Sequence, residues 1–120
     1  MRSTCTTFLA VAVVLLCGGC KKGSSPGPTA AEIKAFEAAT PEVKQVWQVA
    51  LDADRTNDYG KGLSVYYSLL HENLTEEQRE AVGRLSTGLK QRLSDAAQKG
   101  DAAALAALQE LRQRAPNRPR

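Results

Sequence analysis

The sequence of 120 residues lacks the cysteine pattern of a disulfide framework. Its three cysteines, Cys5, Cys17 and Cys20, all fall within the first twenty residues. A disulfide framework needs cysteines spread through the domain that they staple. A zinc site of the common kinds is excluded as well, because His71 is the only histidine and no cysteine follows Cys20. We therefore expect no metal and no cofactor.

The sequence also lacks the patterns typical of catalytic sites. It contains no glycine-rich phosphate loop, and no nucleophile-elbow glycines surround Ser64 or Ser68. No two carboxylates have a spacing that predicts general acid–base work. We expect His71 to be a partly exposed residue at a helix C-terminus, where the helix dipole favours it. The chain is therefore not expected to be an enzyme, although a small enzymatic or ligand-binding module using His71 and a neighbouring carboxylate is an alternative.

An acidic stretch that begins at Asp52 has some of the features of a calcium loop. Such a loop needs glycine at its sixth position and a bidentate acid at its twelfth, where this chain has Asn57 and Leu63. Asp58 is better explained as the N-cap of a helix.

The sequence also lacks a large excess of charge of either sign, since the net charge is only +3. Acidic residues outnumber basic ones from Thr29 to Asp58, and basic residues outnumber acidic ones after that point. The last nine residues contain Arg112, Arg114, Arg118 and Arg120 and no acid. This mild charge asymmetry is not the strongly basic footprint of a nucleic-acid-binding protein.

The chain begins with a short apolar segment that follows a single charge at Arg2. The run from Phe8 to Leu16 is about ten residues long, which suits a secretory signal, whereas a membrane-spanning helix needs about twenty. Gly18, Gly19 and Cys20 then resemble the lipobox of bacterial lipoproteins, with Cys17 where leucine is usual. The resemblance implies cleavage between Gly19 and Cys20, and diacylglyceryl transfer to Cys20. Acyl chains such as palmitate would then hold the protein stably to a membrane.

This interpretation divides the chain into four parts. They are a signal peptide (1–19), the acylated cysteine with a flexible linker (20–28), a helical domain (29–115) and a basic Pro/Arg tail (116–120). In bacteria with two membranes, the residue after the acylated cysteine helps to decide whether a lipoprotein stays in the inner membrane. Lys21 is not a residue of the retained type, so by analogy the outer membrane is favoured. The alternatives are an uncleaved membrane anchor and a cleaved signal without lipid.

Helix-capping signals and helical periodicity predict an all-α domain. Possible N-caps recur before each periodic segment, and no segment shows the alternation of a strand. We expect two stacked antiparallel helical hairpins plus a short leading helix. Ile33 and Phe36 are predicted as the apolar side of the leading helix, and Leu105, Leu108 and Leu111 as the buried seam of the last. Gly83 and Gly88 are expected to permit close helix approach, with a soft stretch of helix as the alternative.

Part of this domain resembles tetratricopeptide-like helical hairpins. The likeness covers roughly 41–116, with turns further apart than the repeat's period of about 34 residues. It implies a repeat-like pair of hairpins, not an array. The positions that carry it are Trp47, Asn57-Asp58-Tyr59, Gly62, Leu63, Tyr66, Lys99-Gly100-Asp101 and Pro116.

Candidate contact residues remain on the predicted surface. Tyr66 and Tyr67 are neighbours on a helix and point about 100° apart, so Tyr67 is the one expected outside. Together with Arg112 and Arg114 it forms the predicted partner surface. The function we expect is that of a non-catalytic adaptor lipoprotein, held to the membrane by Cys20, which binds a partner protein and no nucleic acid. A structural envelope spacer that binds anionic lipid or cell wall is the other alternative.

Overall fold

Five helices joined by short turns make up the described part of the protein, which is residues 27–115 of a computed structural model. No strand occurs within this range, so the predicted all-α class is confirmed. The helices are α1 (Ala30–Glu37), α2 (Pro41–Arg55), α3 (Tyr59–Leu70), α4 (Glu76–Gln98) and α5 (Ala102–Arg114).

Each helix begins at a side-chain cap that the sequence predicts. The Thr29 hydroxyl accepts the backbone N–H of Glu32, and the Glu32 carboxylate accepts the backbone N–H of Thr29 at 2.7 Å. Caps of this kind satisfy amides that have no partner inside the first helical turn. The remaining helices start at Thr40, Asp58, Thr75 and Asp101, each of which accepts a backbone N–H from the first turn.

Two backbone positions reverse the chain through left-handed conformations. Gly100 has φ +82° and separates α4 from α5, as expected for a glycine that follows a helix. Asn57 has φ +55° in the turn between α2 and α3. Asparagine is among the few residues with a side chain that adopt this conformation readily.

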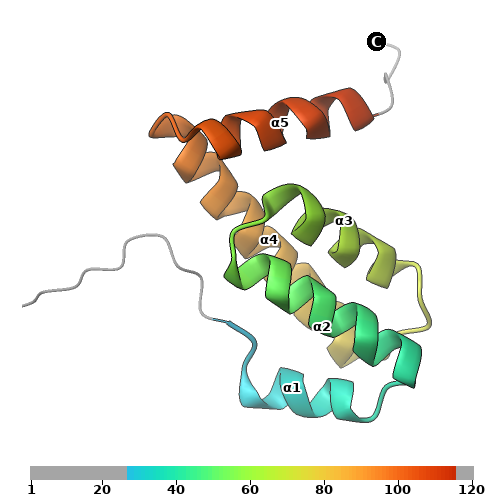
Figure 1. The fold of residues 1–120 in the computed structure, drawn as a ribbon. Coiled ribbons are helices and arrows are strands. Elements are labelled where there is room, and N and C mark those ends of the chain that lie inside the picture. Colours follow the sequence, from blue (N-terminus) through green and yellow to red (C-terminus); the bar gives the residue numbers. More distant parts are fainter. Residues whose placement is uncertain (1–26, 116–120) are drawn as a thin grey trace, which may run out of the picture.

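The long helix α4 holds the arrangement together (Figure 1). Helices α2 and α3 lie side by side in front of α4, and α1 crosses beneath them. Helix α5 turns back from the C-terminal end of α4 and lies above α3. Because α4 touches α1, α3 and α5, it joins the two ends of the domain.

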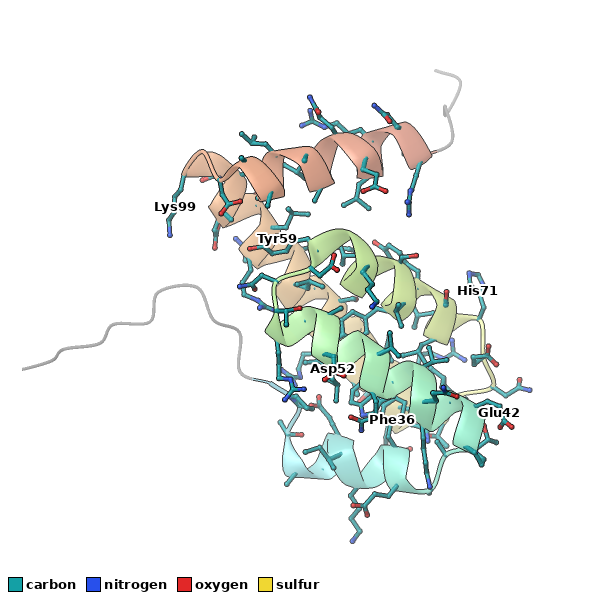
Figure 2. All side chains as sticks on the ribbon, in the orientation of Figure 1. Phe36, Glu42, Asp52, Tyr59, His71 and Lys99 are labelled. Atoms are coloured by element: carbon teal, nitrogen blue, oxygen red, sulfur yellow. The ribbon has the colours of Figure 1, made fainter. Side chains whose placement is uncertain are left out.

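The core is built from one apolar face of each helix. Phe36 from α1 stacks on Trp47 from α2, with ring centroids 3.8 Å apart and ring planes inclined by 4°. Figure 2 shows Phe36 between these two helices. The other large side chains that are fully buried are Tyr66, Leu63, Leu69, Leu89, Leu93 and Val82.

Polar contacts attach α1 to α4 at the edge of this core. The side chain of Gln78 caps α4 through its oxygen and donates its amide N–H to the Ala35 carbonyl at 2.8 Å. Arg84 binds both carboxylate oxygens of Glu32, with its Nε 2.7 Å from Oε1, and also donates to the Gly27 carbonyl. The hydrogen bonds from Arg84 hold the pKa of Glu32 below its usual range.

Two predicted apolar contacts are wrong. Ile33 is 45% exposed, because Phe36 alone faces inward from the short helix α1. Leu105 is 46% exposed, and the buried position of α5 is the neighbouring Ala104. Leu108 only packs partly against the core, so α5 is the least deeply buried of the long helices.

Gly62 permits close helix packing, the expectation for Gly83 is wrong, and that for Gly88 stays a prediction. A Cβ atom at Gly62 would lie 2.6 Å from the Leu89 side chain, so α3 approaches α4 closely there. A Cβ atom at Gly83 would meet nothing within 4 Å.

Candidate functional site

A groove with an apolar floor lies where α3, α4 and α5 meet. It has a volume of about 450 Å³. The groove exists because α5 buries only Ala104 completely and leaves its leucines half-covered. The residues that line it are Leu63, Ser64, Tyr67, Lys90, Leu93, Leu108, Leu111, Arg114 and Ala115.

Tyr67 stands at the edge of this groove. Tyr66 is fully buried and Tyr67 is 41% exposed, as the angle between neighbouring helical positions predicts. The ammonium of Lys90 lies over the Tyr67 ring, 5.0 Å from its centroid. This cation–π contact helps to hold the ring in place, although the side chain remains partly open to solvent.

The structure brings together two of the three predicted partner-surface residues. Arg114 lines the groove with Tyr67, whereas Arg112 does not. Arg114 also forms an ion pair with Glu110 one turn earlier, and both side chains are more than half exposed. An ion pair this exposed contributes little energy, so Arg114 can exchange that partner for another.

His71 lies outside this groove. It lies at the C-terminus of α3 as predicted, where it is the C-cap and is exposed, and Figure 2 shows its side chain at the outer end of that helix. No hydrogen bond or ion pair within residues 27–115 joins the His71 side chain to a carboxylate. The geometry offers no base or acid to work with this imidazole.

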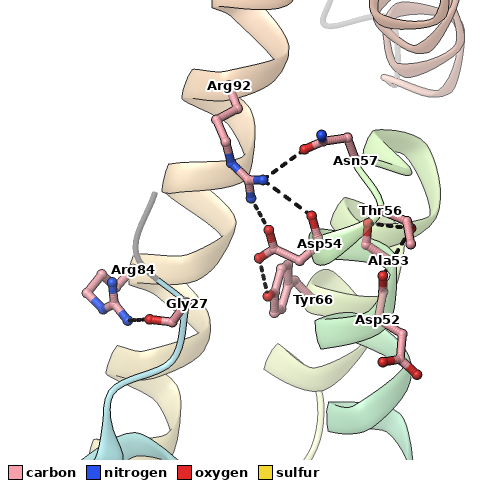
Figure 3. A network of polar contacts seen from close by, with 9 residues as sticks. All are labelled: Gly27, Asp52, Ala53, Asp54, Thr56, Asn57, Tyr66, Arg84 and Arg92. Atoms are coloured by element: carbon pink, nitrogen blue, oxygen red, sulfur yellow. Dashed lines mark hydrogen bonds and ion pairs between the residues drawn. The ribbon is translucent and has the colours of Figure 1, made fainter. Parts of the chain in front are cut away.

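A polar network between α2, α3 and α4 was missed by sequence reasoning (Figure 3). The Asp54 carboxylate pairs with the Arg92 guanidinium and accepts a hydrogen bond from the Tyr66 hydroxyl at 2.6 Å. Arg92 also donates to the Asp54 carbonyl and to Asn57 Oδ1. Burial raises the pKa of Tyr66 to about 12 and lowers the pKa of Arg92.

A signal for this network was present in the sequence. Asp54 follows Trp47 by seven residues and Ala50 by four, so it lies on the buried face of α2. A carboxylate on such a face needs a cation, because an unpaired buried charge is very costly. The partner Arg92 lies 38 residues away, and only the fold identifies it. The network joins α2, α3 and α4 and explains their relative positions, so we assign it to stability.

The described range contains neither a metal site nor a membrane-spanning helix. No three His, Cys, Asp or Glu side chains between residues 27 and 115 are grouped to hold a metal ion. Within the same range, no helix combines the length and apolarity needed to cross a bilayer. Gly19, Cys20, the signal peptide and the 116–120 tail lie outside the described residues, as does most of the linker.

Searches against protein-family models, curated proteins and solved structures found no match to this chain. The tetratricopeptide-like resemblance and the lipoprotein resemblance therefore stay predictions.

Proposed function

We propose that this chain is a membrane-anchored envelope lipoprotein, acylated on Cys20, whose helical domain is a non-catalytic adaptor for a partner protein. The observation that carries the adaptor role is the groove between α3, α4 and α5, with Tyr67 exposed at its edge. Partly exposed aromatic side chains beside apolar pockets are common anchors of protein interfaces. The resemblance to a lipobox supports the anchoring to a membrane.

The tether would keep this groove close to the membrane. Fully extended, the chain from Cys20 to Gly27 reaches at most about 25 Å. At Gly27 the backbone is hydrogen-bonded to Arg84 on α4, so the tether joins the body of the domain there. A partner of the adaptor would therefore be another envelope protein within reach of the tether plus the helical domain, at the outer membrane in a cell that has two.

Metabolic labelling with an alkyne analogue of palmitate tests whether Cys20 is acylated. We expect label in the wild-type chain and in Cys17→Ser, and none in Cys20→Ser, because only Cys20 would remain after cleavage. The intact mass of the membrane-bound protein should correspond to residues 20–120 plus acyl groups. An unmodified chain that retains residues 1–19, or label that survives Cys20→Ser, would contradict the proposal.

Site-specific photocrosslinking in living cells tests the adaptor role. A photoreactive phenylalanine analogue at Tyr67 should give one discrete crosslinked species, and Leu111→Asp should abolish it by placing a charge in the groove. The same analogue at Gln45, an exposed residue of α2, is the matched control and should not give that species. Absence of a discrete product from Tyr67, or the same product from Gln45, would count against an adaptor.

A further inference from the structure

The groove has a chemistry that specifies the class of its partner. We infer that it binds an amphipathic helix of a partner protein, with acidic side chains beside the apolar stripe. This inference rests on the adaptor function proposed above and identifies the partner segment.

The floor and walls of the groove fit an apolar stripe. Leu63 and Leu93 form a buried floor, and Leu108 and Leu111 of α5 stand half-covered beside it. Tyr67 adds an exposed aromatic ring at the edge. A volume of about 450 Å³ lies within the range of pockets that hold a few large apolar groups. Helices fill such grooves with side chains spaced three, four and seven residues apart.

The charges of the groove select an acidic partner. Among residues 27–115, Lys90 and Arg114 are the only charged residues that line it, and no Asp or Glu does. Within residues 27–115 no carboxylate forms an ion pair with Lys90, and the one partner of Arg114 is the exposed Glu110. Carboxylates on a bound helix would meet both cations, which favours association and disfavours basic segments.

Other occupants fit less well. Residues 116–120 of this chain follow Ala115 at the groove, but they carry Arg118 and Arg120 and no acid, so Lys90 and Arg114 would repel them. A second copy offers no exposed stripe of large apolar side chains in the described range. Its other exposed large apolar side chains, Ile33 and Leu105, are single residues on separate helices.

Peptide binding to the acylated full-length mature protein tests the inference. The protein is placed in nanodiscs of phosphatidylcholine, and binding is followed by the fluorescence anisotropy of two designed helical peptides. Both peptides carry the same leucine stripe, flanked in one by glutamates and in the other by lysines. We expect the glutamate peptide to bind at least about tenfold more tightly than the lysine peptide. Its glutamates would pair with Lys90 and Arg114, whereas the lysines of the other peptide would be repelled by them.

Charge reversal of the groove should invert this preference. The double variant Lys90→Glu/Arg114→Glu should lose about tenfold in affinity for the glutamate peptide and gain affinity for the lysine peptide. The double variant Lys44→Glu/Arg55→Glu makes the same change of net charge at exposed positions of α2 and should change neither affinity by more than about twofold.

Several outcomes would overturn the inference. They are equal binding of the two peptides, no inversion on charge reversal, binding to nanodiscs that lack the protein, and dimers in light scattering that Leu111→Asp dissociates. Identification of the segment crosslinked to Tyr67 separates the two proposals. A crosslinked segment without acidic residues overturns the inference and leaves the adaptor function intact, whereas no crosslink at all removes the adaptor function.

Discussion

The Tyr66 hydroxyl donates a hydrogen bond of 2.6 Å to the Asp54 carboxylate, and Arg92 holds the same carboxylate from the other side. Asp54 is buried and Arg92 is mostly buried, with side-chain exposures of 12% and 13%. Three helices thus meet at one ion pair. Buried ion pairs of this kind often add little net stability but are costly to break, because the remaining charge has no partner.

Breaking this ion pair should destabilise the domain far more than breaking an exposed one. Arg92→Ala leaves the Asp54 carboxylate without its cation and should lower the free energy of unfolding by about 3 kcal/mol. Arg55→Ala is the control, because Arg55 pairs with Asp52 where the two side chains are 78% and 63% exposed, and it should cost less than about 1 kcal/mol. Urea denaturation followed by circular dichroism measures both, and equal losses would contradict the structural role of the network.

Alkaline pH should destabilise the domain through Tyr66. Its pKa is raised to about 12 in the folded state by burial, against about 10 in the unfolded chain. Between these values the unfolded chain releases the proton and the folded one keeps it, so stability falls as pH rises, by up to about 1.4 kcal/mol per pH unit.

Tyr66→Phe provides the control for this pH effect. It should cost about 2 kcal/mol near neutral pH, since Asp54 loses a donor. Between pH 10 and 12, urea midpoints of the variant should fall less steeply than those of the wild type. Parallel curves for the two proteins would show that Tyr66 does not cause the decline.

Two glycines should respond in opposite directions to replacement by alanine. Gly62→Ala places a methyl group 2.6 Å from the fully buried Leu89 side chain, and overpacking of this kind costs about 1–3 kcal/mol. Gly83→Ala meets nothing within 4 Å inside a helix and should stabilise the domain by about 0.5–1 kcal/mol. Thermal unfolding compares them, and a stabilised Gly62→Ala variant would show that α3 and α4 are further apart than described.

The stack of Phe36 on Trp47 should control the attachment of α1. Phe36→Ala removes the only buried side chain of that helix and should cost about 3–5 kcal/mol. It should also expose Trp47, the single tryptophan, so that its fluorescence emission shifts to longer wavelength. Ile33→Ala, on the same helix but exposed, should cost less than about 1 kcal/mol and leave the emission unchanged. Similar effects of the two variants would argue against the stack.

Local chemistry made the helix boundaries predictable. A cap such as Thr75 with Gln78 acts within four residues, and Gly100 adopts its conformation without long-range help. Tyr67 could be placed outside for a similar reason, because the angle between it and Tyr66 follows from helix geometry alone. Arg114 was also among the predicted contact residues, yet nothing in the sequence indicated that it lies in one groove with Tyr67.

The sequence by itself determined five helices, their caps and most of their inward faces, because these depend on contacts within one or two helical turns. Only the tertiary structure decided which neighbours cover those faces. Leu105 is exposed and Ala104 is buried because of how α5 lies against α3 and α4. The same partial cover leaves the groove open, and the pairing of Asp54 with Arg92 arises from contacts across 38 residues. Such contacts depend on the packing of whole helices, which no short stretch of sequence encodes.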